Sequence, residues 1–145
     1  MKLKIKKLND NAILPKRATE NSAGADLYAC IENPVIIKKG EIVKIPTGIS
    51  VEPENKNTVL MVFARSGLSS KYGITLANCT GIIDSDYRGE IIVPLINLGK
   101  SDFTIEKNMR IAQLVVTPVI FPEIIEAENL SDTERGINGF GSTGI

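Results

Sequence analysis

Apolar side chains occur along this chain in short runs rich in Ile and Val, and each run is ended by Gly, Pro, Asn or Asp. Such interrupted runs of β-branched residues are typical of strands in all-β domains. A run of small residues over 66–72 predicts one short helix, with Ser66 as its cap. Many short strands in one domain predict a sandwich, jelly roll or barrel. The predicted strands are residues 3–7, 26–29, 34–38, 41–45, 58–64, 90–97 and 111–119.

The length and charge of the chain limit the kinds of partner that it could bind. A chain of 145 residues is the size of one domain, and its 17 Lys and Arg residues balance 17 Asp and Glu residues. No overall field therefore attracts nucleic acid or an anionic membrane. The longest apolar stretch, residues 111–121, is far short of the ~20 residues that span a bilayer, and the N-terminus lacks a signal peptide. We expect a soluble, cytoplasmic protein with neither a nucleic-acid nor a membrane partner.

The cysteines and the absence of histidine restrict the chemistry. Without histidine, Ser-His, Cys-His and His-ligated zinc mechanisms are excluded, so a general base has to be a carboxylate. Cys30 and Cys79 lie far apart without metal-ligand spacing, which predicts reduced, buried thiols.

The C-terminal residues 135–145 are rich in glycine and predict a flexible arm that orders only against a ligand or partner. Arg135, Ser142 and Thr143 are anion donors, and Phe140 offers a face on which a base can stack. The G-x-G-x-x-G spacing in this segment lacks the following helix of a dinucleotide fold, so it indicates a phosphate-binding lid. A frayed terminus is the alternative. The acidic residues 123–134 before it are expected to lie on the surface of the domain.

Residues 81–89 place two carboxylates, a phenol and a guanidinium between glycines, as in a hairpin. If the segment stays extended, Asp84 and Asp86 face one side and Tyr87 the other, unless a turn reverses them. A solvated polar turn is the alternative. A calcium loop is excluded because Arg88 occupies a ligand position.

A second anion site is predicted where Arg65 and Ser66 begin the short helix, because the helix dipole favours negative charge there. The triplet at residues 99–101 is similar to the end of a P-loop. Pro94 replaces the glycine which that loop requires, so this motif fails.

Five ordered segments together resemble deoxyuridine triphosphatase of the trimeric type, and the resemblance spans nearly the whole chain. Asn78 has the family's spacing before Asp84. The departures are small: Asn138 stands where glycine is more usual, and Ala64 where Pro or Gly is common. The matching segments are residues 23–29, 65–68, 81–89, 110–114 and 135–145.

The resemblance implies an all-β, jelly-roll-like β-barrel over residues 1–134 and a mobile C-terminal lid over residues 135–145. It implies a homotrimer with active sites at subunit interfaces. It also implies hydrolysis of dUTP to dUMP and pyrophosphate by water attack on the α-phosphorus, which keeps uracil out of DNA and supplies dUMP for dTMP synthesis. Mg²⁺ would be held by the triphosphate and by waters, with no direct protein ligand.

The resemblance also implies roles for individual residues. Asp84 would be the catalytic base, and Asp26 would support the site. The phosphates would be bound by Arg65, Ser66, Gly67, Gln113, Arg135, Ser142 and Thr143. Uracil and deoxyribose would be bound by Asn78, Gly81, Ile83, Tyr87, Phe140 and Gly141.

Two other functions compete with this interpretation. A dCTP deaminase shares the implied fold, but Pro94 occupies the place of its catalytic glutamate, and the run Asp86-Tyr87-Arg88 departs from its usual pattern. A bifunctional deaminase is disfavoured for the same reason. A non-catalytic jelly-roll module would bind a nucleotide or partner without turnover. Loss of Asp84, Arg65 or the arm would have favoured it, and all are present.

Overall fold

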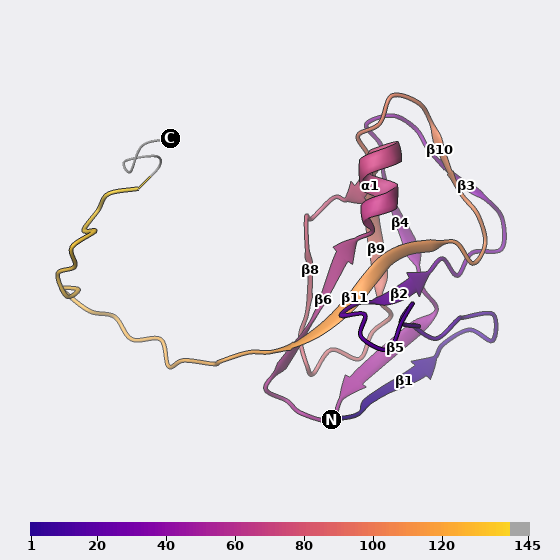
Figure 1. The fold of residues 1–145 in the computed structure, drawn as a ribbon. Coiled ribbons are helices and arrows are strands. Elements are labelled where there is room, and N and C mark those ends of the chain that lie inside the picture. The colour runs from indigo at the N-terminus through magenta and orange to yellow at the C-terminus, as the bar shows by residue number, and fades with distance from the viewer. Residues whose placement is uncertain (140–145) are drawn as a thin grey trace.

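The fold is built from short strands, many of which pair across long stretches of sequence (Figure 1). The structure, a computed structural model, describes residues 1–139. Within that range the strands are β1 (Leu3–Lys7), β2 (Ala25–Tyr28), β3 (Val35–Ile37), β4 (Ile42–Pro46), β5 (Ile49–Pro53), β6 (Thr58–Ala64), β7 (Ile74–Leu76), β8 (Gly81–Ile83), β9 (Ile92–Asn97), β10 (Phe103–Ile105) and β11 (Arg110–Pro118), and the helix is α1 (Ser66–Tyr72).

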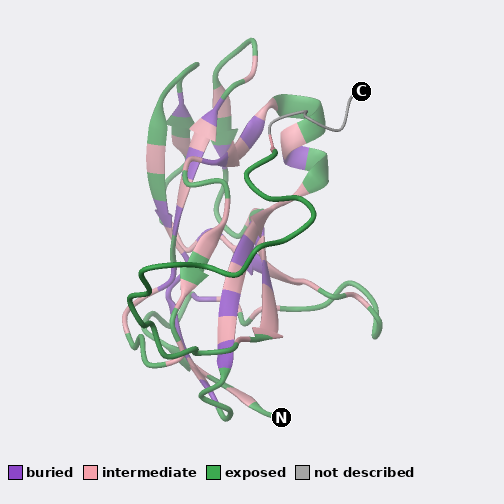
Figure 2. Cartoon of the chain, turned by 90° about the vertical axis from the view of Figure 1, so that its left-hand side faces the viewer, coloured by how far each residue is buried: buried purple, intermediate pink, exposed green. Residues whose placement is uncertain are grey.

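The strands β6 and β11 form the centre of a four-stranded sheet ordered β2-β11-β6-β8. Their residues alternate between the two faces of the sheet, as the period of a strand requires. Leu60 and Val62 of β6 are buried, and so is Leu114 of β11, which pairs with Val62. Figure 2 shows this alternation along the strands. One face of the sheet therefore closes the core, and the other is free to carry a site.

The remaining strands form a three-stranded sheet ordered β4-β9-β7 and the pairs β1-β5 and β3-β10. Side chains from these sheets meet the inner face of the four-stranded sheet in one apolar core. Its fully buried large members include Leu27, Ile45, Ile49, Leu60, Leu95 and Ile111. The predicted all-β class is confirmed for the described part of the chain.

The short helix has the bounds that the sequence predicted, but its start differs. Its N-cap is Arg65, whose backbone is extended and whose side chain makes no capping hydrogen bond. The prediction of Ser66 as the cap is wrong, because Ser66 is already the first helical residue and its carbonyl accepts the Ser70 hydroxyl at 2.6 Å. Among the described residues, no helix has the length and hydrophobicity that a membrane crossing needs.

The prediction of two buried thiols holds only in part. Cys30 is half-buried, whereas Cys79 is exposed in the turn between β7 and β8. The prediction of burial is therefore wrong for Cys79.

After β11 ends at Pro118, the chain leaves the body as an arm (Figure 1). The expectation that residues 123–134 lie on the domain surface is therefore wrong for this subunit. The large apolar side chains of the arm meet little of their own subunit: Ile124 is 94% exposed and Leu130 is 89% exposed. Apolar groups left open in this way require a partner surface if they are to be buried.

Candidate active site

A cavity opens where the chain passes from β8 to β9, which belong to different sheets. The prediction of a hairpin over residues 81–89 is therefore wrong: β8 pairs with β6, and the segment after it bridges two sheets. The space between the diverging sheets is a cavity of about 260 Å³, called here the apolar pocket. It is lined by Val62, Leu76, Asn78, Gly81, Ile82, Ile83, Asp84, Tyr87, Glu90, Ile91, Ile92 and Pro94.

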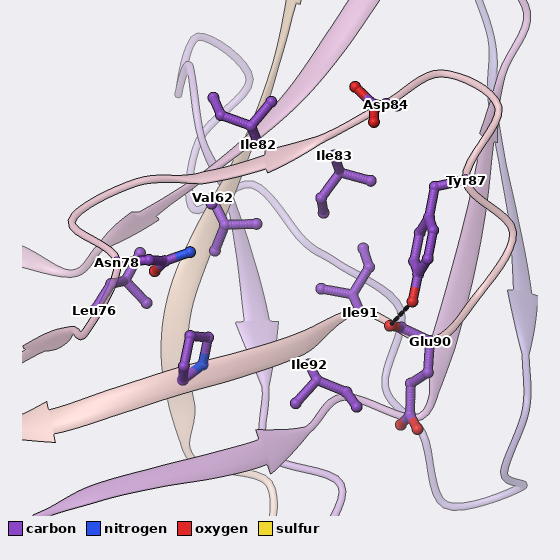
Figure 3. Close-up of a pocket in the computed structure, with 12 residues that line it drawn as sticks. Val62, Leu76, Asn78, Ile82, Ile83, Asp84, Tyr87, Glu90, Ile91 and Ile92 are labelled. Atoms are coloured by element: carbon purple, nitrogen blue, oxygen red, sulfur yellow. Dashed lines mark hydrogen bonds between the residues drawn. The ribbon is translucent and has the colours of Figure 1, made fainter.

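The apolar pocket carries polar groups at its two ends (Figure 3). The amide of Asn78 lies at one end, and Asp84 and Tyr87 lie at the other. Between them the wall is aliphatic, with Leu76 and Ile91 buried. A mostly apolar cavity with a few polar groups at fixed places suits a small flat molecule that has a hydrogen-bonding edge.

Asp84 and Tyr87 face the same cavity because the chain turns between them. The N–H of Tyr87 donates to the Asp84 carbonyl at 3.1 Å, so the alternation of β8 stops at Ile83. Asp84 and Asp86 still line a neighbouring cavity together, as the extended pattern predicts, but the turn also brings Asp84 to the apolar pocket with Tyr87, which Asp86 does not line.

The ring of Tyr87 is held by its own loop. Its hydroxyl donates to the Glu90 carbonyl at 3.2 Å. The ring lies so close to Gly89 that a Cβ atom there would collide with Tyr87 Oη and Cζ. Arg88 adds to the stiffness of the loop by donating to the carbonyls of Ser85 at 2.8 Å and Tyr87 at 3.0 Å. The loop therefore presents Tyr87 as a fixed wall.

Pro94 also lines the apolar pocket, on β9. The position that would carry the glutamate of a deaminase therefore faces this cavity, and here it holds a ring without a titratable proton.

A second cavity, of about 390 Å³, lies where β2, β11 and the start of α1 meet, and is called here the arginine pocket. It is lined by Ala18, Ser22, Ala23, Gly24, Asp26, Arg65, Ser66, Gly67, Arg110 and Gln113.

The charges of the arginine pocket are arranged around one carboxylate. Asp26 Oδ1 lies 2.9 Å from Arg65 Nε, and Asp26 Oδ2 lies 3.2 Å from Arg110 Nη1. The side chain of Asp26 is only 14% exposed, whereas that of Arg110 is 51% exposed. Two guanidinium groups share one carboxylate, so these three side chains keep one net positive charge. Such a pocket favours an anion, and guanidinium forks suit phosphate oxygens.

Polar groups without charge complete this cavity. Gln113 donates Nε2–H to the Ala64 carbonyl at 3.0 Å, which fixes its amide. Ser66 and Gly67 are exposed at the start of α1.

The two pockets lie on different parts of the same subunit. β2 and β8 are the opposite edges of the four-stranded sheet. Gly81 pairs with Val62 on the core-facing side, whereas Asp26 pairs with Gln113 on the other face. The structure thus brings Asn78, Gly81, Ile83, Asp84 and Tyr87 to one pocket, and Asp26, Arg65, Ser66, Gly67 and Gln113 to the other, but it does not bring the two pockets to each other.

Several predicted residues lie in neither pocket. Arg135 is exposed in the arm, and its Nε–H donates to the Asn138 carbonyl at 3.0 Å. Phe140, Gly141, Ser142 and Thr143 lie outside the described residues. The sequence analysis missed Arg110 and Glu90, which line the arginine and apolar pockets. Arg110 is the first residue of the fourth matching segment and Glu90 directly follows the third, and these positions were the available signal.

Comparison with known proteins agrees with this geometry. A family model described as dUTPase matches residues 10–144. The deoxyuridine 5'-triphosphate nucleotidohydrolase of Nautilia profundicola is 56% identical over 144 residues, which cover 99% of each chain.

Solved structures have the same fold, which confirms the jelly-roll-like prediction. The dUTPase of Staphylococcus bacteriophage 80alpha, solved with dUPNHPP, superposes with a TM-score of 0.90 at 31% identity and covers 99% of both chains. A variant dUTPase from phage phi11 of S. aureus, described with a coordinated structural Mg(II) ion, superposes with a TM-score of 0.80 at 24% identity, covering 91% of this chain and all of that one.

Proposed function

Because this chain belongs to the dUTPase family and hydrolyses dUTP to dUMP and pyrophosphate, we propose that its apolar pocket binds deoxyuridine and its arginine pocket binds the triphosphate. The chain is thus a dUTP diphosphatase, and neither a dCTP deaminase nor a non-catalytic module. One observation supports assigning different roles to the two pockets. The apolar pocket is aliphatic and ends in Asn78, Asp84 and Tyr87, whereas the arginine pocket has an excess of positive charge.

Asp84 directs and deprotonates the attacking water. Its carboxylate is exposed at the mouth of the apolar pocket, at the end away from Asn78 (Figure 3). A uracil ring against Asn78 would leave the sugar near Tyr87 and the α-phosphate near Asp84. A carboxylate in reach of the water contributes about 10²–10⁴ in rate. In-line attack on the α-phosphorus releases pyrophosphate without a covalent intermediate.

Arg65, Ser66, Gly67 and Gln113 bind the phosphates, and Arg110 joins them. Asp26 does not contact substrate in this scheme. It aligns both guanidinium groups, so that their donors face the phosphate oxygens before substrate arrives. Prior alignment of donors means that little reorganisation is needed as charge shifts to the leaving group.

Mg²⁺ is the proposed cofactor, and the triphosphate and waters would hold it. Within residues 1–139 no group of three or more His, Cys, Asp or Glu side chains is placed to hold a metal ion. When bound, the ion neutralises charge on the phosphate oxygens. The chain supplies the carboxylate and the guanidinium groups.

Selectivity comes from the apolar pocket. Asn78 and the backbone at Gly81 and Ile83 pair with the uracil edge, and cytosine would leave those groups unpaired. A site built to pair such groups rejects the wrong partner by about 10⁴–10⁵. Tyr87, fixed against Gly89, lies beneath the deoxyribose and leaves no room for a 2′-hydroxyl.

The enzyme works as a homotrimer with its sites at subunit interfaces. The separation of the two pockets in one chain supports this, because a nucleotide can reach both kinds of pocket where two subunits meet. The outer face of β6 and β11 also carries the half-buried apolar side chains of Met61, Phe63 and Val115, which suit a subunit contact. Light scattering on the purified protein should give three times the mass of one chain.

Residues 1–134 form the domain and residues 135–145 the lid. Arg135, Ser142 and Thr143 close on the phosphates, while Phe140 and Gly141 cover the uracil. Exclusion of water by the lid strengthens each charge interaction beneath it. The exposed apolar residues of the arm support a path over a neighbouring subunit. In the cell, the cytoplasmic reaction keeps uracil out of DNA and supplies dUMP for dTMP synthesis.

A substrate panel tests this scheme. The protein is mixed with Mg²⁺ and with dUTP, dCTP, UTP or dTTP, and pyrophosphate and ammonia are assayed. We expect pyrophosphate from dUTP alone. Ammonia from dCTP, or no product from any of the four, would overturn the assignment.

A further inference from the structure

Glu90 contributes to the rim of the apolar pocket, yet its carboxylate points away from the cavity (Figure 3). Glu90 Oε1 accepts the backbone N–H of Gly48 at 2.7 Å. Gly48 belongs to the turn between β4 and β5. The side chain therefore ties the segment that leads into β9 to a turn remote in sequence.

The turn at Gly48 is a rigid anchor. Gly48 has φ +69°, and a Cβ atom there would lie 2.7 Å from Cys30 Sγ and 2.8 Å from Ala12 Cβ. Its carbonyl also accepts the N–H of Leu8 at 2.7 Å. A group bonded to this turn is held by three other parts of the chain.

The main chain of Glu90 connects this anchor to the active site. The next residue, Ile91, is fastened to the same turn, since its N–H donates to the Ile49 carbonyl at 2.9 Å and its carbonyl accepts the Thr47 hydroxyl at 2.6 Å. The Glu90 carbonyl accepts the Tyr87 hydroxyl at 3.2 Å. Glu90 thus links the anchor, through its side chain, to Tyr87, through its backbone.

We propose that Glu90 is a positioning residue for Tyr87, and that its bond to Gly48 sets the preference of the enzyme for deoxyribose over ribose. The inference rests on the proposed role of Tyr87 beneath the sugar. If the carboxylate is lost, the Glu90 backbone loses one of the bonds that tie it to the Gly48 turn. The peptide that carries the Glu90 carbonyl stays bonded through the Ile91 N–H to Ile49, but it can shift, so the carbonyl holds the phenol less firmly. A shift of about 1 Å in a positioned group is enough to change a rate markedly, and it would admit a 2′-hydroxyl.

The test compares kcat and KM for dUTP and UTP in Glu90→Ala and Glu90→Gln. Glu90→Ala should lower the ratio of kcat/KM for dUTP to that for UTP by about tenfold, the scale of a small steric change in a pocket. Glu90→Gln keeps an oxygen that can accept the Gly48 N–H, so it should restore most of the selectivity.

A matched control exists near the other end of β9. Glu41 Oε2 accepts the Lys38 N–H at 2.9 Å, and the Glu41 carbonyl accepts the Asn97 N–H. Glu41→Ala removes the same kind of bond away from the pocket and should leave selectivity unchanged. An equal loss of selectivity in Glu41→Ala and Glu90→Ala would reduce Glu90 to a general stabilising residue and overturn the inference.

A spectroscopic measurement separates this inference from the role of Tyr87 itself. The chain has three tyrosines, so fluorotyrosine labelling gives few ¹⁹F signals, and Tyr87→Phe identifies one of them. Glu90→Ala should shift or broaden that signal, and Glu41→Ala should not. If Tyr87→Ala leaves selectivity unchanged, the proposed role of Tyr87 fails. If Tyr87→Ala lowers selectivity while Glu90→Ala leaves both selectivity and the signal unchanged, the inference about Glu90 alone is wrong.

Discussion

Asp26 holds Arg65 in a fixed orientation, with 2.9 Å between Asp26 Oδ1 and Arg65 Nε. The carboxylate comes from β2 and is largely buried, whereas the arginine directly precedes α1. Because the Nε edge of the guanidinium is occupied by Asp26, its other nitrogens remain to face a phosphate. One of them already donates to the Arg110 carbonyl at 3.3 Å. In the proposed scheme the pair therefore prepares the binding site for the triphosphate.

Asp26→Asn should lower kcat/KM for dUTP by about 10²-fold, the cost of a misplaced positioning group. The amide keeps the shape of the side chain but loses the charge that aligns Arg65 and Arg110. Steady-state kinetics with dUTP measures the loss. Lys4 and Glu52 form an exposed ion pair between β1 and β5, so Glu52→Gln serves as the control. If it matched the effect of Asp26→Asn, the effect would be one of general electrostatics.

Asp84→Asn should reduce kcat by about 10²–10⁴, the usual contribution of a general base. Binding of dUTP should persist, because the proposed contacts to uracil and phosphate lie elsewhere. Rapid-quench kinetics and calorimetry with dUPNHPP separate the two quantities. Asp86 lies two residues away and outside the apolar pocket, so Asp86→Asn should retain nearly full turnover. Unchanged turnover in Asp84→Asn would remove that carboxylate from the mechanism.

Gly89→Ala should loosen the selectivity for deoxyribose. The added methyl collides with the end of the Tyr87 ring, so the ring has to move away from its place. We expect the preference for dUTP over UTP to fall about tenfold. Circular dichroism and thermal unfolding would verify that the fold is retained. A folded variant with the original preference would contradict the role given to the ring.

Deletion of residues 135–145 should abolish most activity and leave the domain folded. The strands and the core end before this segment, at Pro118, so the thermal transition should be preserved. Phe140→Ala is the milder variant and should raise KM for dUTP more than it lowers kcat. A truncated enzyme at full rate would show that the lid is dispensable.

The two thiols should react at different rates. Burial raises the pKa of Cys30 above its ordinary value of 9.0, and the charges of Glu90 and Glu32 raise it further. The thiolate is the reactive form, so Cys30 should be labelled more slowly than the exposed Cys79 at pH 8. Because the raised pKa belongs to the folded state, the contribution of Cys30 to stability is complete below pH 9.0 and is lost as the pH rises through the folded pKa. Mass spectrometry after timed alkylation measures both rates.

Most of the strands that the sequence predicted are long enough to show a pattern, and the three-residue β3 was found because an apolar run over 34–37 surrounds it. Residues 3–7 and 58–64 were predicted with the bounds of β1 and β6. The strands β7, β8 and β10 have three residues each, too few for alternation to be visible. β5 was missed because Pro53 ends it and Glu52 interrupts its apolar run, although its partner β1 supplies Lys4 directly opposite Glu52. That pairing depends on a contact between distant segments, which local pattern does not report.

For the candidate site, too, some features could be predicted from the sequence and others could not. Motif residues such as Asp84 and Arg65 could be selected from type and spacing alone. The contacts that hold these side chains in place could not be predicted from type and spacing. Arg110 shares Asp26 with Arg65 only because β11 pairs with β2, and Glu90 reaches Gly48 only because β9 pairs with β4 and places Ile92 opposite Pro46. Both relations are properties of the assembled fold.

In the proposed trimer, the separate location of the apolar and arginine pockets would make each chain donate one half of a site to each of two neighbours. Two differently damaged subunits can then repair each other. If Asp84→Asn and Arg65→Ala chains are unfolded, mixed in equal amounts and refolded as random trimers, about a quarter of the junctions unite two undamaged halves. Two preparations that are each nearly inert should regain measurable turnover on mixing.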